Sequence, residues 1–155
     1  MYRFVDQRCE QIVNGSRFLL SAMRDWVISA RLRRCPSPTL EPLFSRMNMP
    51  DMLGDFHGWM FHLYRGTRLN LTFGCHCERH ILEDEALLLA LWSDVACERL
   101  EEARALLGLL VHGPSVDAMI ADMICIASRM SMQGLAPWGL ASESISDAIG
   151  SRSAR

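Results

Sequence analysis

Residues 81–111 read ILEDEALLLALWSDVACERLEEARALLGLLV, and this stretch decides the fold class. From Leu82 to Leu110, apolar and small side chains recur at alternating intervals of four and three residues, which keeps one face of an α-helix against a neighbour. The first half adds further large apolar residues between these positions, so a helix there is buried on most sides. Gly113 and Pro114 follow and stop a helix. We therefore predict one long central helix over 81–111.

Four other segments have helical patterns. Residues 3–33 carry a seam of alternating four- and three-residue spacing from Val5 to Ala30, and Pro36 follows it. Shorter helices are expected over 39–47 and about 51–64, and another over 116–132. Residues 69–73 alternate apolar and polar side chains, but one such segment cannot form a sheet alone, so we expect an extended connector.

These elements predict an all-α fold in one domain. At 155 residues the chain has the size of a single domain and can bury a sizeable core without disulfides or metals. We predict a helical bundle of three long helices plus one or two short helices over residues 1–140. Residues 141–155 are small and polar, so they are expected to form a flexible C-terminal tail.

Composition narrows the functional classes. No apolar run approaches the roughly 18 residues of a membrane span, and acidic residues interrupt any signal-like segment near the N-terminus, so we expect a cytoplasmic protein without a membrane anchor. The net charge is −2, and the arginines at 31, 33 and 34 fit the C-terminal end of a helix, so nucleic acid is not expected as a partner. In a reducing cytoplasm the six cysteines are expected as thiols or ligands.

The most unusual cluster is GCHCERH at residues 74–80, with two cysteines and two histidines within six residues. Cysteine and histidine are the preferred ligands of zinc. We expect Cys75, Cys77 and His80 to face one pocket, with His57 or His62 of the preceding helix opposite. The spacing lacks the paired C-x₂-C of ordinary zinc modules, so surface histidines beside a cysteine-containing loop are the alternative.

A thiol redox site is a further alternative, because a helix N-terminus favours a reactive thiolate. The acidic residues at 78 and 83–85 oppose a thiolate but would favour a cation. Cys9, Cys97 and Cys125 lie on helix patterns that suggest buried, inert thiols.

No common catalytic motif is present, which favours a non-enzymatic protein without excluding an enzyme. The leading hypothesis is a helical interaction or regulatory protein that binds itself, as a homodimer, or a partner protein. The homodimer is suggested by the apolar first half of the 81–111 helix, which a small bundle has few helices to cover. The alternatives are a bundle with a zinc site near Cys75–His80 and a thiol redox protein.

Overall fold

The computed structural model describes residues 2–137 of the chain, and the tail predicted over 141–155 lies outside them. The described part confirms the all-α fold in a single helical domain. It contains six α-helices and four short 3₁₀ turns. The helices are α1 (Asn14–Arg31), α2 (Ser37–Arg46), α3 (Leu53–Gly66), α4 (Glu83–Ala96), α5 (Leu100–Leu110) and α6 (Val116–Met132).

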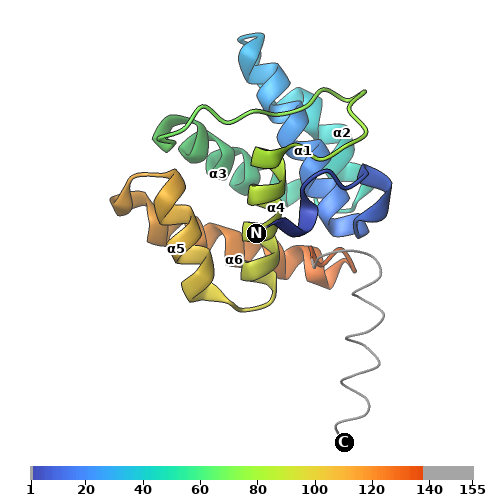
Figure 1. Ribbon diagram of the computed structural model, residues 1–155. Helices are drawn as coiled ribbons and strands as arrows, with labels where there is room; N and C mark the ends of the chain where they lie inside the picture. The colour runs from blue at the N-terminus through green and yellow to red at the C-terminus, as the bar shows by residue number, and fades with distance from the viewer. Residues whose placement is uncertain (1, 138–155) are drawn as a thin grey trace, which may run out of the picture.

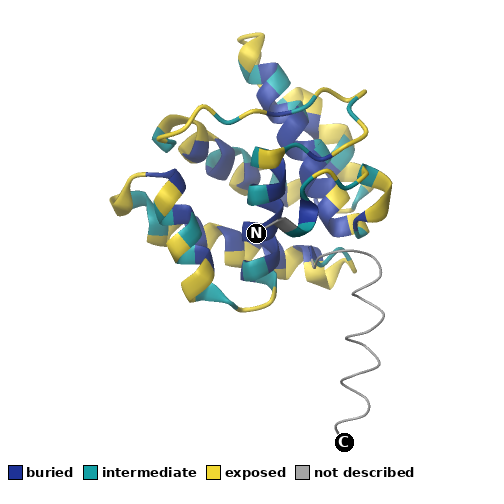
Figure 2. Cartoon of the chain, viewed as in Figure 1, coloured by how far each residue is buried: buried dark blue, intermediate teal, exposed yellow. Residues whose placement is uncertain are grey.

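Helix α4 is the centre of the molecule, with α1, α2 and α3 on one side and α5 and α6 on the other (Figure 1). The N-terminal 3₁₀ turn η1 (Tyr2–Phe4) also packs on α4. Every residue of α4 from Leu88 to Ser93 is buried (Figure 2). A helix that is apolar nearly all round is therefore covered within one chain.

The helix predicted over 3–33 begins only at Asn14, so the prediction is wrong for residues 3–13. Residues 6–9 instead pair with the chain before α4: the N–H of Ile81 donates to the carbonyl of Gln7 (2.9 Å), and the N–H of Cys9 donates to that of Arg79 (2.8 Å). Gly15 then lies so close to the Leu135 carbonyl that a Cβ atom would collide with it. Pairing with a distant segment has replaced the first turns of the predicted helix.

The helix predicted over 81–111 is two helices, because the chain turns at Glu98. Its φ of 61° lies in the left-handed region, which ends an α-helix. The N–H of Arg99 donates back to the carbonyl of Asp94 (2.8 Å), and the Arg99 side chain pairs with the Asp94 carboxylate (2.8 Å). Neither glycine nor proline marks this turn in the sequence.

Between α3 and α4 the chain runs across the outer side of α1 and α3 (Figure 1). We call residues 67–73 of this passage the connector. As expected, the alternating 69–73 stretch forms no strand, and the described residues contain only isolated bridges such as Thr67 with Val111. None of the helices in residues 2–137 has the length and apolar character that crossing a bilayer requires.

Candidate functional site

A buried ion pair joins α1 to the start of α4. The Arg24 and Glu85 side chains are 5% and 0% exposed, and they meet through two hydrogen bonds, Nε to Oε1 (2.7 Å) and Nη2 to Oε2 (2.8 Å). Burial alone would lower the pKa of Arg24, but the hydrogen bond and charge of Glu85, with a smaller effect of Cys9, raise it. Arg24 therefore stays protonated, as a buried guanidinium beside a carboxylate should.

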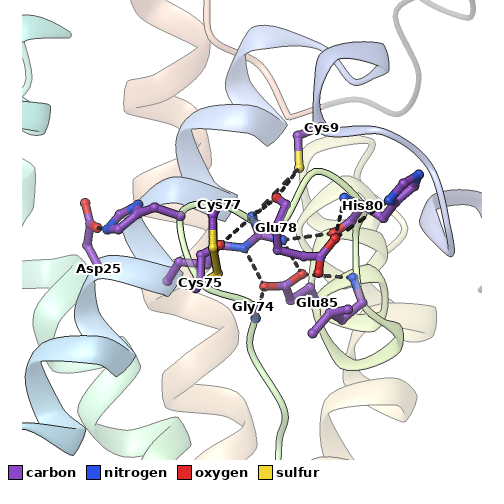
Figure 3. Close-up of polar contacts among 11 residues, drawn as sticks. Cys9, Asp25, Gly74, Cys75, Cys77, Glu78, His80 and Glu85 are labelled. Atoms are coloured by element: carbon purple, nitrogen blue, oxygen red, sulfur yellow. Dashed lines mark hydrogen bonds and ion pairs between the residues drawn. A yellow bond between two sulfur atoms is a disulfide. The ribbon is translucent and has the colours of Figure 1, made fainter.

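The pair holds the backbone of residues 74–82, which we call the CHC loop. Arg24 Nη1 donates to the carbonyls of Glu78 (2.8 Å) and Cys75 (3.3 Å), and Nη2 donates to that of His80 (3.1 Å). Glu85 accepts hydrogen bonds from the N–H groups of Gly74 (2.8 Å) and Leu82 (2.9 Å). One buried pair thus binds the loop at both ends and at its middle (Figure 3).

Within this loop Cys75 and Cys77 form a disulfide, with their Cα atoms 5.3 Å apart. Both residues are exposed, and the N–H of Glu78 donates to the Cys75 carbonyl (3.1 Å) to close the turn. Figure 3 shows the sulfur–sulfur bond on the loop to the left of the Glu85 carboxylate. The disulfide therefore joins two exposed residues on a turn whose backbone is held by Arg24 and Glu85.

The charged groups around the disulfide are paired locally. His76, whose side chain is 63% exposed, lies against the carboxylate of Asp25. Burial raises the pKa of Asp25, and the charge of His76 partly offsets this effect. The pKa of Glu78 is lowered, chiefly because its carboxylate accepts a hydrogen bond from the His80 N–H (3.0 Å). His80 Nδ1 lies 3.7 Å from the same carboxylate.

The ligands predicted for zinc have other partners in this structure. Cys75 and Cys77 are bonded to each other, and His80 faces Glu78. On α3, His57 Nδ1 accepts a hydrogen bond from Trp26 Nε1 (2.9 Å), and the exposed His62 ring packs beside Phe61. Among residues 2–137, no group of three or more histidine, cysteine or acidic side chains is placed to hold a metal ion. A zinc site here stays a prediction for the reduced thiols.

The other cysteines differ from expectation in their exposure. Cys97 and Cys125 are exposed, although their helical patterns suggested burial, because the first falls at the turn between α4 and α5 and the second on the outer side of α6. Cys9 is partly buried, and its sulfur contacts the Glu78 carbonyl (3.7 Å) beneath the CHC loop. Cys9, Cys35, Cys97 and Cys125 are all free thiols.

Sequence reasoning missed both members of the buried ion pair. In the sequence, Glu85 stands out only as one of the acidic residues at 78 and 83–85, which oppose a thiolate and favour a cation. Arg24 directly follows Met23 on the apolar seam, and an arginine beside a predicted buried seam was the available signal. Identifying its partner required knowledge of which segment crosses α1.

A second feature is a groove of about 330 Å³ between α1, α3 and the connector. Val27 and Arg31 of α1, Tyr64 of α3, and Leu69 and Phe73 of the connector are among its lining residues. The stretches that supply its lining residues, 27–31 and 60–73, contain three arginines and no aspartate or glutamate. These arginines are Arg31, which lines the groove, and Arg65 and Arg68, and all three are exposed.

Comparisons with known proteins give no indication of this chain's function. No protein family model matches this chain, and neither a curated protein nor a solved structure does.

Proposed function

We propose that the protein is a non-enzymatic interaction module whose groove between α1, α3 and the connector binds an acidic, amphipathic segment of a partner protein. The observation that carries this proposal is a groove lined by aliphatic and aromatic side chains and by Arg31, with Arg65 and Arg68 next to lining residues in the sequence. None of these three arginines has a carboxylate partner within the described residues. Such a surface offers both parts of a peptide-binding site, an apolar floor and charges that orient the ligand.

The apolar part is exposed beyond what isolated surface residues explain. Tyr64 and Leu69 line the groove and are 53% and 52% exposed, and Phe61 nearby on α3 is 44% exposed. Single exposed apolar residues are ordinary, but a group of them beside a groove is typical of an interaction site. A partner's aliphatic or aromatic side chain would fill the groove and remove these groups from water.

The charged part favours an acidic ligand. Arg31 lines the groove, while Arg65, placed over the Phe61 ring at 5.5 Å, and Arg68 lie beside it in sequence. Guanidinium groups bind carboxylates through paired hydrogen bonds. The Asp84 carboxylate, which contacts the connector, accepts the Thr72 N–H (2.6 Å) and pairs with none of these arginines.

Two other partners are less favoured by the same observations. A second copy of this chain, as in the homodimer expected from the sequence, would bring like-charged rims together if the contact had two-fold symmetry. A nucleic acid would match the arginines but not the aliphatic lining from Val27, Leu69 and their neighbours. We place the interaction in the cytoplasm, where the four free thiols are compatible with a reducing environment.

Photo-crosslinking in the source cells tests this proposal. A photoreactive amino acid at Asn70, in the groove, is compared with one at Glu102, an exposed residue of α5. We expect position 70 alone to capture a protein, and the crosslinked peptide to combine acidic with apolar residues. Capture of RNA or of a second copy of this chain would contradict the proposed partner, as would equal capture at both positions.

Charge reversal provides the second test of the groove. The double variant R31E/R68E should abolish the crosslink at position 70, because it replaces attraction to the acidic segment with repulsion. The control is R46E, at the exposed C-terminal end of α2, which makes a single charge reversal and is therefore compared with R31E alone as well as with the double variant. If R46E weakens capture as much as the double variant, the effect comes from net charge and the groove is not the site.

A further inference from the structure

We propose that Cys75 and Cys77 form a reversible dithiol–disulfide site that exchanges with low-molecular-weight disulfides, and that Arg24 and Glu85 keep the two sulfur atoms together when the site is reduced. This redox site goes beyond the proposed partner binding and does not depend on it.

The two cysteines meet the first requirement of such a site, which is access. Both are exposed, and one residue separates them. Their Cα separation of 5.3 Å lies within the usual range for disulfides, so the bond can form without movement of the backbone. Disulfides are rare in the reducing cytoplasm expected for this protein. Those that form there are usually transient and have a catalytic or redox-sensing role.

The second requirement is that the loop keeps its shape after the bond breaks. The contacts that hold it are made by backbone groups: Arg24 binds the carbonyls of Cys75 and Glu78, and Glu85 binds the N–H of Gly74. None of these hydrogen bonds involves Sγ of Cys75 or Cys77. Reduction therefore removes one covalent bond and leaves the turn from Cys75 to Glu78 held by the same buried pair.

A second set of backbone hydrogen bonds also holds the CHC loop. Residues 6–9 pair with residues 79–81 through three backbone hydrogen bonds of 2.8–3.2 Å, directly after the cysteines. The reduced thiols are thus confined to a short turn fixed on two sides. Groups held together in this way react with a high effective concentration, which favours closure of the disulfide over the persistence of a mixed disulfide.

The exchange proceeds in two thiolate attacks and transfers two electrons. One cysteine thiolate attacks a sulfur atom of a low-molecular-weight disulfide RSSR, forming a mixed disulfide and releasing RS⁻. The second cysteine thiolate attacks the protein sulfur of the mixed disulfide, forms the Cys75–Cys77 bond and releases the second RS⁻. The two protons lost by the protein thiols convert these anions to two RSH. Two electrons pass from the protein to RSSR, and the reverse sequence reduces the protein.

Equilibration with glutathione tests the proposal. A C35S/C97S/C125S variant, which removes three free thiols that are exposed in the structure, is incubated with mixtures of reduced and oxidised glutathione, trapped with acid and alkylated. Mass spectrometry should detect a species that has lost two hydrogens, with the bond mapped to Cys75 and Cys77. Its population should follow the oxidised concentration divided by the square of the reduced concentration. The same background with C77S should form only the mixed disulfide.

Two further measurements test whether the folded loop holds the reduced thiols. Circular dichroism should show the same helix content in both redox states. The effective concentration of the thiol pair should also be at least about tenfold higher in folded than in urea-denatured protein. The proposal is overturned if folded protein accumulates only mixed disulfides, if reduction removes the helical signal, or if folded and denatured protein give equal effective concentrations.

Discussion

At the scale of single residues, Glu85 has a larger structural role than its place in an acidic helix turn suggests. Its two carboxylate oxygens accept hydrogen bonds from Arg24, Gly74 and Leu82 while the side chain is fully buried. If glutamine replaced Glu85, its side-chain NH₂ group would face another hydrogen-bond donor, and the Arg24 guanidinium would lose its counter-charge. We expect Glu85→Gln to reduce the free energy of unfolding by about 3–5 kcal/mol, the usual effect of breaking a buried pair. Urea denaturation followed by circular dichroism measures it.

The control for this change is Glu102→Gln, which makes the same substitution at an exposed position of α5. Surface substitutions of this kind alter stability by no more than roughly 0.5 kcal/mol. If the two variants lose equal stability, the Glu85 carboxylate does not organise the CHC loop in the way its contacts indicate.

At the scale of helices, the turn between α4 and α5 forms without the residue that such a turn favours. Glu98 adopts a left-handed φ of 61°, where a side chain costs energy that glycine avoids. We expect Glu98→Gly to raise the free energy of unfolding by about 0.5–1 kcal/mol, after the entropy that glycine adds to the unfolded chain is subtracted. Thermal and urea unfolding measure this gain.

A glycine inside a helix should have the opposite effect. Ala105 is exposed in the middle of α5, and Ala105→Gly should cost about 1 kcal/mol because it lowers helix propensity. Loss of stability in both variants would mean that Glu98 is not held in the left-handed conformation in solution.

At the scale of the whole molecule, the apolar surface of α4 does not require a second copy of the chain to cover it. The sequence suggested a homodimer because the first half of α4 is apolar nearly all round. The structure covers this helix with α1, α5, α6 and the N-terminal turn of the same chain. Unfolding of an obligate dimer depends on concentration, whereas unfolding of a self-sufficient chain does not.

We therefore expect one unfolding midpoint over about a hundredfold range of protein concentration. Thermal denaturation at several concentrations, beside sedimentation of the native protein, measures this directly. A midpoint that rises with concentration, together with twice the chain mass in sedimentation, would show that the folded state needs its copy and would support the homodimer prediction.

The sequence by itself was enough to predict the fold class and several helix positions. The helix predicted over 116–132 has those bounds in the structure, and the ends of those predicted over 39–47 and 51–64 are displaced by one or two residues. Helical spacing and terminal signals such as Pro36 and Pro114 act within a few residues of the chain, so a local pattern contains the information.

Only the tertiary structure decided the features that join distant segments. Residues 6–9 have a helical sequence pattern but form no α-helix, because their backbone pairs with residues 79–81. Arg24 pairs with Glu85, which lies 61 positions away in the sequence. The cysteine and histidine cluster suggested zinc, but which of its side chains meet depends on how the CHC loop is held. Hydrogen bonds and burial between remote segments compete with local helical preference, and periodicity along the chain does not report them. The spacing of residues therefore determined the helices, whereas the buried ion pair determined the site.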